Sequence, residues 1–260
     1  MTCRICSAKT HAFGHGTIIG KHDVAFYQCG ACGFIQTDEP VWLDEAYAEA
    51  INRSDIGLVR RNLVLSIQSS AIITMFFDHR KRFIDFGGGY GLLVRLMRDR
   101  GYNFYRSDAH CANLFARGFD AEPAGAGQYE LLTAFEVFEH LVDPVATIEH
   151  MLSYSSSILF STELVTVPAP QPDAWWYYSL DHGQHVSFFT AQSLCVLAKR
   201  FGLNLYTSGR SLHLLTRKTI AQNAFALLSR YKVARLIDMV IPERSLLPAD
   251  YRAVTGKELS

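Results

Sequence analysis

The sequence predicts an α/β fold in which a doubly wound, mostly parallel sheet carries helices on both faces. Three observations lead to this fold class. Short apolar runs alternate with amphipathic segments between residues 81 and 218, a run of glycines follows the first apolar run, and two Cys-x2-Cys pairs precede both. Strands and helices that alternate at this spacing form parallel sheets covered on both sides. We therefore expect one α/β domain behind a small cysteine-rich segment.

The composition is that of a globular chain without a dominant charge. Of the 260 residues, 49% are hydrophobic, and 25 Lys and Arg residues balance 25 Asp and Glu residues. A net charge of zero gives no reason to expect a nucleic-acid partner. Residues 1–10 lack the apolar core of a signal peptide, and the longest uncharged stretch, residues 62–77, is too short and too polar to span a membrane. We expect a cytoplasmic protein with reduced cysteines and no membrane span.

Four segments follow one another along the chain. Residues 1–37 hold the paired cysteines, residues 38–80 form a helical lid or linker, residues 81–218 form the α/β domain, and residues 219–260 form a C-terminal helix and tail. Apolar periodicity defines the elements within them. The expected strands are 82–86, 103–107, 129–135, 157–165, 203–207 and 212–217. The expected helices are 41–51, 55–77, 90–100, 111–117, 144–154, 190–201 and 219–241.

Capping and breaking residues set the ends of these helices. Pro40 opens the first helix, and Asp55 is a plausible N-cap for the second. Gly101 ends the helix that follows the glycine run. Pro144 stands at the first turn of its helix, where its missing N–H costs nothing, and Thr190 caps the helix after it. The two last strands are expected to pair with each other across a short turn.

The segment FIDFGGGYG, residues 83–91, is the most informative part of the chain. Counted from Gly87 as the first position, glycines stand at the first, third and fifth positions as Gly87, Gly89 and Gly91. Asp85 lies two residues before Gly87. A dinucleotide fingerprint requires a glycine at the sixth position, which is Leu92 here. Glycines let a ligand approach the backbone, and the following helix N-terminus favours a carboxylate. The register therefore favours a ligand other than a dinucleotide.

An acidic residue follows at the end of the next strand. Asp108 lies 21 residues after Gly87. A carboxylate at this place accepts hydrogen bonds from ribose hydroxyls in nucleotide-binding folds. The alternative interpretation is a plain tight turn in which Asp108 only caps a helix.

Three motifs together resemble those of the class I S-adenosylmethionine (SAM)-dependent methyltransferases. They are Asp85-Phe-Gly-Gly-Gly-Tyr-Gly91, Asp108, and Phe135-Glu-Val-Phe-Glu-His-Leu-Val-Asp-Pro144. The resemblance covers about residues 80–217, and the third motif is similar to the branch with ubiquinone-pathway O-methyltransferases and sugar methyltransferases. It implies a Rossmann-like, seven-stranded sheet whose last strand is antiparallel.

The resemblance also implies roles for individual residues. Gly87, Gly89 and Gly91 would line the methionine part of SAM, and Asp108 would hold its ribose. The adenine would lie near Ala109 and His110. Phe135 and Glu136 would end the fourth strand beside the amino group and the sulfonium, and Glu139 and His140 would follow just past it. The acidic residue that usually faces the adenine is not assigned, because residues 122–128 form a short segment rich in alanine and glycine.

The N-terminal cysteines predict a structural zinc site in a small zinc-ribbon-like knob. Cys3 and Cys6 form one Cys-x2-Cys pair, and Cys29 and Cys32 form a second. Two such pairs supply four thiolates for a closed tetrahedral site. Disulfides and a redox motif are the alternatives. The arrangement resembles the zinc-binding segment of sugar C-methyltransferases, although the further C-terminal domain of those enzymes is absent here.

The loop after the fifth strand is expected to face the methyl acceptor. Trp175, Trp176, Tyr177 and Tyr178 are aromatic faces suited to stacking on sugar rings, and they suit contacts in a homodimer equally well. Ligands of doubly wound sheets bind at the carboxyl ends of the strands, where this loop begins.

Histidines in the same loop are the first candidates for a general base. An acceptor hydroxyl must lose a proton as it attacks the methyl group, and the pKa of imidazole suits this step at neutral pH. His182 and His185 fit that role, and Glu139 and His140 are second candidates. An alternative interpretation is a metal site that His182 and His185 share with Asp181, and for His185 another is a purely structural role. Tyr47, Arg60 and Arg61 lie on helices that would cover the cofactor.

The sequence thus predicts a SAM-dependent methyltransferase that acts on a small molecule. A sugar, nucleotide-sugar or glycan hydroxyl is the expected acceptor, with O-methylation favoured over C-methylation. One alternative is an RNA base methyltransferase with a zinc-ribbon module, against which the zero net charge argues. The other is a non-catalytic scaffold, against which the intact glycine turn and Asp108 argue.

Overall fold

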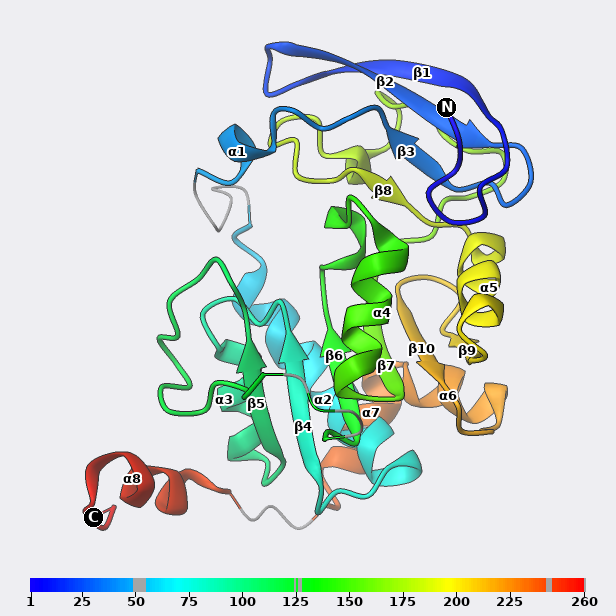
Figure 1. The fold of residues 1–260 in the computed structure, drawn as a ribbon. Helices are drawn as coiled ribbons and strands as arrows, with labels where there is room; N and C mark the ends of the chain where they lie inside the picture. Colours follow the sequence, from blue (N-terminus) through cyan, green and yellow to red (C-terminus); the bar gives the residue numbers. More distant parts are fainter. Residues whose placement is uncertain (49–54, 124, 126–127, 242–244, 260) are drawn as a thin grey trace.

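The computed structural model describes residues 1–48, 55–123, 125, 128–241 and 245–259. In these residues the chain forms two sheets (Figure 1). A six-stranded sheet occupies the middle of the molecule, and a four-stranded sheet lies at one end of it. The order of the main sheet is β5–β4–β6–β7–β10–β9. Its strands are β4 (Arg82–Phe86), β5 (Asn103–Ser107), β6 (Leu131–Ala134), β7 (Ser157–Ser161), β9 (Asn204–Thr207) and β10 (Leu212–Thr216).

Four strands of the main sheet are parallel and two are not. β5, β4, β6 and β7 pair in parallel, whereas β10 pairs antiparallel with both β7 and β9. The chain order reverses at β4, from which β5 lies on one side and β6 on the other. This is the doubly wound, mostly parallel sheet that the sequence predicts. Ligands bind at such a reversal, beyond the carboxyl ends of the strands.

The expected seventh strand is absent from the described residues. On the free edge of β5, only Arg106 and Asp120 form a parallel bridge. The chain then continues as Ala121-Glu-Pro-Ala-Gly-Ala-Gly127. Proline cannot donate to a sheet, and alanine and glycine have low strand propensity, so the pairing ends after one bridge.

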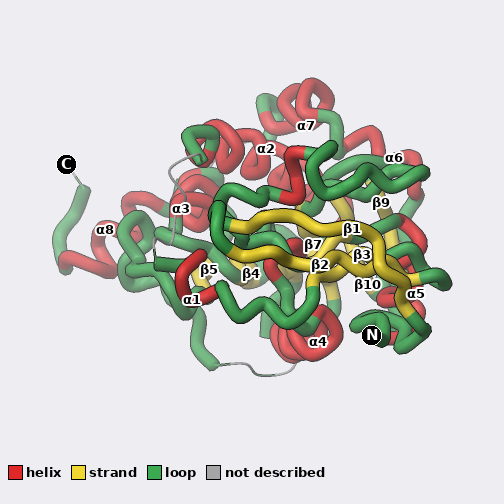
Figure 2. The backbone as a smooth tube through the Cα atoms, turned by 90° about the horizontal axis from the view of Figure 1, so that it is seen from above, coloured by secondary structure: helices red, strands yellow, loops and turns green. Residues whose placement is uncertain are grey.

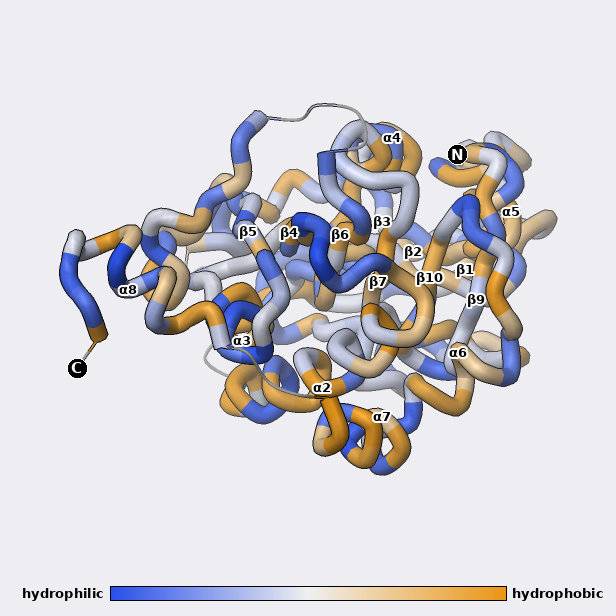
Figure 3. The backbone as a smooth tube through the Cα atoms, turned by 90° about the horizontal axis from the view of Figure 1, so that it is seen from below, coloured by the Kyte–Doolittle hydropathy of each residue, from blue (hydrophilic) through white to orange (hydrophobic). Residues whose placement is uncertain are grey.

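Helices cover both faces of the main sheet and bury two apolar cores. α4 (Pro144–Tyr154) and α5 (Ala191–Arg200) cover one face, and the cluster beneath them includes Ile84, Leu132 and Phe160. On the other face, Phe83, Phe104 and Leu159 meet a second set of helices. This set contains α2 (Leu58–Phe76), α3 (Leu92–Asp99), α6 (Gln222–Leu228) and α7 (Tyr231–Asp238). α2 and α7 lie side by side beneath the sheet (Figure 3).

Several expected helices differ from those observed. No helix forms over residues 111–117, because the Asn113 side chain accepts from the Ala116 N–H and donates to its carbonyl, a local alternative to helical bonds. The helix expected over 219–241 is interrupted at Ser229 and gives α6 and α7. Residues expected to form a tail contain α8 (Leu247–Thr255).

α8 is held against α3 by buried charges. The Arg98 guanidinium donates to both carboxylate oxygens of Asp250, at 2.9 and 2.6 Å, and Arg95 lies 2.9 Å from the same carboxylate. The side chains of Arg98 and Asp250 are each 6% exposed. Such a pair requires both partners, since one alone would be a buried, uncompensated charge.

The cysteine segment is built into the rest of the molecule. Its strands β1 (Thr10–Ile18), β2 (His22–Cys29) and β3 (Ile35–Thr37) form a sheet with β8 (Ser187–Phe188), in the order β1–β2–β3–β8. Figure 2 shows β1 and β2 lying across the top of the main sheet. Phe34 packs on Phe189 with ring centroids 5.1 Å apart, and Thr190 donates to the Cys32 carbonyl at 2.6 Å. Residues 1–37 and the α/β domain therefore share a core. The predicted domain boundaries stay a prediction.

Of the helix expected at 41–51, the structure shows α1 (Leu43–Ala46). Residues 49–51 lie outside the described part of the chain. Within the described residues, none of the helices has the length and apolarity needed to cross a bilayer.

Candidate active site

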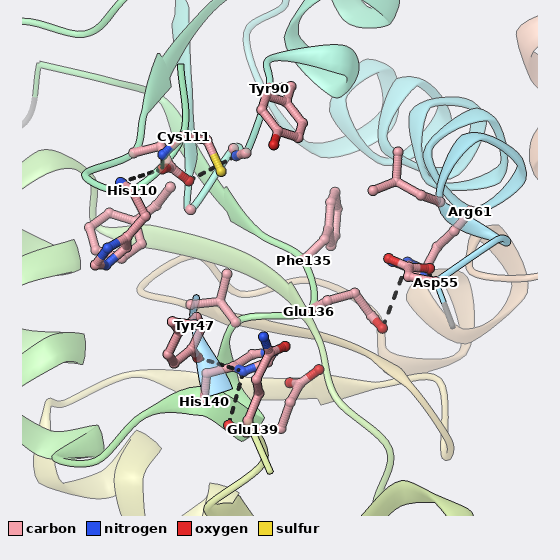
Figure 4. Close-up of a pocket in the computed structure, with 18 of the residues that line it drawn as sticks. Tyr47, Asp55, Arg61, Tyr90, His110, Cys111, Phe135, Glu136, Glu139 and His140 are labelled. Carbon is pink, nitrogen blue, oxygen red and sulfur yellow. Dashed lines mark hydrogen bonds and ion pairs between the residues drawn. The ribbon is translucent and has the colours of Figure 1, made fainter. Parts of the chain in front are cut away.

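A large open cavity lies beyond the carboxyl ends of β4 and β6. Its volume is about 1620 Å³. Pockets for single small ligands hold roughly 300–1,000 Å³, so this cavity has room for a cofactor and an acceptor together. Five stretches of chain line it: α1 and the start of α2, the glycine turn after β4, the loop after β5, residues 135–142, and residues 176–185. Figure 4 shows the side chains that project into it.

The glycine turn forms one wall of the cavity. Gly87, Gly89 and Gly91 have φ values of 67°, 52° and 85°, which side chains rarely adopt. A Cβ on Gly87 would lie 2.7 Å from a Val137 methyl, and one on Gly91 would lie 2.7 Å from the Asn113 side chain. A Cβ on Gly89 would meet no protein atom within 4 Å. Gly87 and Gly91 are therefore required by packing, whereas Gly89 leaves open space. Gly91 is the N-cap of α3 and does not line the cavity.

Asp108 connects the glycine turn to the loop after β5. Its Oδ2 accepts from the Gly89 N–H at 2.9 Å, and its Oδ1 accepts from the N–H groups of His110 and Cys111, both at 2.8 Å. A carboxylate has about four acceptor positions, so Asp108 retains capacity for another donor. The residue lines the cavity at the predicted place, and its binding of a ribose stays a prediction.

Arg106 supports this wall from behind, and the sequence analysis missed it. Its guanidinium donates to the carbonyls of Gly89 and Cys111 and to the Asp120 carboxylate. The side chain is 5% exposed. The available signal is an arginine at a buried position of a strand that leads to Asp108. A buried guanidinium needs several acceptors, and the turns around it supply them.

Asp85 lies under the same turn. It is buried and accepts from the Thr133 hydroxyl at 2.7 Å. Burial raises the pKa of the Asp85 carboxyl to about 7, with the nearby Asp108 carboxylate adding to the shift. One of its oxygens is 2.8 Å from the position that a Cβ of Gly88 would take. Asp85 thus packs against the backbone that forms the turn.

The remaining predicted cofactor residues also line the cavity. These residues are Ala109, His110, Phe135 and Glu136. Glu136 has a φ of 55°, and its Oε1 accepts from the Ser161 hydroxyl at 2.6 Å. Its second oxygen lies 3.7 Å from Arg61, which forms two hydrogen bonds with Asp55 (Figure 4). The predicted lid residue Arg61 therefore lines the cavity beside Glu136.

The four predicted catalytic residues meet at the other end of the cavity. Glu139 and His140 belong to the short helix η1 (Phe138–His140), and His182 and His185 come from the loop before β8. The Val186 N–H donates to the Glu139 carbonyl at 2.8 Å and holds the two segments together. The rings of His140 and His185 are 4.9 Å apart, and those of His182 and His185 are 5.1 Å apart. No pattern in the sequence indicates that these two distant segments form one cluster.

The hydrogen bonds of His182 and His185 place the ring proton on different nitrogens. His185 Nδ1 lies 2.7 Å from the Tyr177 carbonyl and therefore donates to it, which leaves a lone pair on Nε2. His182 Nδ1 accepts from the Gln184 N–H at 3.3 Å, which leaves a proton on Nε2. Burial lowers the pKa of both imidazoles, and that of His185 lies well below its usual range. His185 is therefore neutral near pH 7, with its proton on Nδ1 and a proton-accepting lone pair on Nε2.

Tyr47 covers this cluster from the N-terminal side. Its hydroxyl lies 2.9 Å from His140 Nδ1, and its ring stacks on His110 with centroids 6.1 Å apart (Figure 4). The Trp42 indole donates to the Gly183 carbonyl at 2.8 Å, and the Gln184 amide donates to the Ala46 carbonyl at 2.8 Å. The segment after the cysteines thus holds the histidine loop in place.

Comparison with protein families assigns the chain to one of them. A family described as "Methyltransferase domain" matches residues 65–208, more than half of the 260 residues. The chain belongs to this methyltransferase family. This match supports the predicted enzyme class at the level of the family. Among curated proteins, no sequence matches this chain.

Comparison with solved structures finds matches of low sequence identity. The chain is 19% identical to TnmH, over 69% of this chain and 62% of that one, with a TM-score of 0.44. It is 14% identical to the mitomycin 7-O-methyltransferase MmcR, over 67% and 60%, with a TM-score of 0.43. An O-methyltransferase family protein from Burkholderia thailandensis is 12% identical, over 69% and 64%, with a TM-score of 0.43. The matched region spans less than two thirds of each of these proteins, and the family assignment rests on the domain match.

The four aromatic side chains of residues 175–178 have different surroundings. Trp176 and Tyr177 line the cavity, and Trp176 is 71% exposed. Trp175 and Tyr178 pack with Phe188 in the apolar cluster of the four-stranded sheet, and Tyr177 also belongs to this cluster. The Tyr177 hydroxyl lies 3.1 Å from the Thr162 hydroxyl. Of the four predicted substrate residues, the structure brings only Trp176 and Tyr177 to the cavity.

The four N-terminal cysteines of the methyltransferase converge on one point. Their Sγ atoms lie within 4.8 Å of one another. Measured distances are 3.7 Å between Cys3 and Cys32, 3.4 Å between Cys6 and Cys29, and 3.6 Å between Cys6 and Cys32. These values exceed the roughly 2.05 Å of a disulfide bond. The thiols are free, and three of the four residues are buried.

Proposed function

We propose that the methyltransferase binds SAM along the glycine turn and transfers its methyl group to a hydroxyl of a small molecule at the histidine cluster. One observation carries this proposal. The glycine turn with its open position at Gly89 and the cluster of Glu139, His140 and His185 line the same cavity. The N-terminus of α3 follows the turn and favours a carboxylate such as that of methionine.

Bound SAM supplies an activated methyl group, so the protein mainly aligns and deprotonates the acceptor. The new bond joins the acceptor oxygen to the methyl carbon, the carbon–sulfur bond breaks, and one proton leaves the hydroxyl. We assign activation of that hydroxyl to His185, whose Nε2 lone pair is free. Its simplest action is that of a general base, as the sequence predicts.

A sugar, a nucleotide-sugar or a glycan end is the acceptor class we favour. The exposed Trp176 at the cavity gives an aromatic face on which a sugar ring can stack. The balanced charge of the chain disfavours RNA, which requires an excess of cationic contacts. We propose O-methylation over C-methylation. The cytoplasmic location and a homodimer stay predictions.

We also propose that the four cysteines hold a structural zinc ion. Thiolates at the usual zinc–sulfur distance of about 2.3 Å occupy the corners of a tetrahedron with edges of about 3.8 Å. The measured sulfur distances of 3.4–3.7 Å are close to this value. Four protein ligands leave no open position, so this ion would stabilise the fold and take no part in methyl transfer.

Turnover of a His185 variant tests the assignment of the acceptor site. Release of S-adenosylhomocysteine is measured with a panel of nucleotide sugars, free sugars and phenols. We expect His185→Ala to lower turnover of the accepted compound by about 10²-fold or more, and SAM affinity to change by less than about twofold, because the side chain lies at the acceptor end. Normal turnover by His185→Ala would remove His185 from the reaction.

A further inference from the structure

The cluster at the acceptor end has the composition of a metal site. Among the described residues, two groups of side chains are arranged to hold an ion, the four cysteines and the set Glu139, His140 and His185. In the second group, one nitrogen of each imidazole and one carboxylate oxygen all lie within 4.8 Å of one another. Two histidines and one carboxylate bind Zn²⁺, Fe²⁺ and related ions while leaving positions open for other ligands.

Both histidines are oriented as metal ligands usually are. His185 Nδ1 donates to the Tyr177 carbonyl at 2.7 Å. His140 Nδ1 lies 3.1 Å from the Gln184 carbonyl and 2.9 Å from the Tyr47 hydroxyl, and both oxygens can accept its proton. A backbone carbonyl that holds one ring nitrogen fixes the tautomer and turns the other nitrogen, with its lone pair, to the metal. Neither Nε2 atom has a hydrogen-bond partner in the described structure that would compete for that lone pair with an ion.

Glu139 provides a second, independent observation. Its side chain is fully buried at 0% exposure, it lines the cavity, and neither of its carboxylate oxygens has a hydrogen-bond partner in the described structure. Buried carboxylates are normally paired or bound to a metal, because desolvation of an isolated charge is very costly. A cation between Glu139 and the two imidazoles offsets that cost.

We propose that Glu139, His140 and His185 bind a divalent transition-metal ion at the acceptor end of the cavity. Three protein ligands leave positions open on the side of the cavity. Asp181, which the sequence suggested as a partner of the two loop histidines, is not in this group, and neither is His182.

The metal site adds a role for an ion to the proposed methyl transfer, and this inference rests on that proposed function. An acceptor hydroxyl that coordinates the ion has a lowered pKa and loses its proton to water at the open mouth of the cavity. The acceptor oxygen then forms its bond to the methyl carbon as the carbon–sulfur bond breaks. With the ion bound, His185 acts as a ligand in place of a base. Two open positions favour an acceptor with neighbouring oxygens, such as the vicinal diol of a sugar.

Manganese titration tests the site without interference from the cysteines. Mn²⁺ prefers nitrogen and oxygen ligands to thiolates, so it leaves a zinc-loaded cysteine site unchanged. The full-length, zinc-loaded protein is titrated with Mn²⁺ by electron paramagnetic resonance. We expect one Mn²⁺ per chain, and we expect Glu139→Gln to weaken its binding at least about tenfold. His182→Gln is the matched control and should change Mn²⁺ affinity by less than about twofold, because His182 is outside the ligand set.

Two results would overturn the metal site. One is a folded wild-type protein that takes up no Mn²⁺, and the other is unchanged Mn²⁺ binding by Glu139→Gln. If Glu139→Gln does not fold, His140→Gln takes its place with the same expectation. A SAM titration of the same samples separates the two proposals. Binding of SAM but not of Mn²⁺ would contradict the metal site and leave the proposed function standing. Binding of Mn²⁺ but not of SAM would contradict the proposed function and leave the metal site standing.

Discussion

At the scale of single residues, Gly89 and Asp108 show what the sequence could reveal and what it could not. The glycine spacing and the distance to the acid place both residues at the cavity, as expected. The partners of Asp108 were not predictable, since they are backbone N–H groups of Gly89 and of its own loop. Arg106 and the contact of Glu139 with the histidine loop depend on segments far apart in the sequence, and no local pattern encodes them.

Gly89→Ala tests whether the open space at the turn holds the cofactor. Its Cβ meets no protein atom, so the free energy of unfolding should fall only by the about 1–2 kcal/mol of left-handed strain. SAM affinity should fall at least about tenfold, because the Cβ enters the place of the ligand. Gly20→Ala is the matched control, with a similar φ of 66° and nothing within 4 Å, but in the turn between β1 and β2. Equal SAM affinity in both variants would contradict the prediction that the cofactor occupies the open space at Gly89.

At the scale of elements, the sequence predicts well wherever burial or a cap sets the ends. β4 and β5 have the expected bounds, and so does α4, whose Asp143 N-cap accepts from the Ala146 N–H at 3.0 Å. α5 begins after Thr190 in a capping box with Ser193. The failures are at the molecular edge. In the described residues the expected seventh strand is reduced to one bridge, after which proline, alanine and glycine follow. Residues 111–117 form no helix, because the side-chain bonds of Asn113 outweigh periodicity, and the C-terminal helix is divided at Ser229.

The attachment of α8 gives a prediction at this scale. Asp250→Asn leaves Arg98 without its counter-charge, so we expect the free energy of unfolding to fall by about 3 kcal/mol in urea titrations. Glu258→Gln removes a matched pair with Arg252 whose side chains are 72% and 63% exposed. It should cost less than about 1 kcal/mol. A similar, small loss in both variants would show that the buried pair does not hold α8.

At the scale of the whole molecule, the cysteine segment and the active site depend on each other. β3 pairs with β8, and β8 follows His185 by two residues. The sequence predicts the cysteine site from its spacing, but it gives no sign that residues 1–37 share a sheet with residues 187–188. Such a pairing joins segments about 150 residues apart, and sequence periodicity carries no information on strand partners.

Loss of zinc should therefore disable the acceptor site as well as the N-terminal segment. We expect Cys29→Ser to lose about one zinc per chain in metal analysis, to unfold at lower temperature, and to lose turnover through the displaced histidine loop. Cys195→Ser, a free cysteine in α5, serves as the control and should keep its zinc. A zinc-free Cys29→Ser protein with full stability and turnover would contradict this coupling.

All the proposed functional roles require that the cavity beyond β4 binds SAM. The most direct measurement is a calorimetric titration of the zinc-loaded protein with SAM, with NAD as the comparison. The glycine register and the open position at Gly89 predict SAM binding with a dissociation constant on the order of micromolar, which corresponds to about −8 kcal/mol, and no binding of NAD. A folded, zinc-loaded protein that binds NAD, or that binds no SAM, would contradict the account.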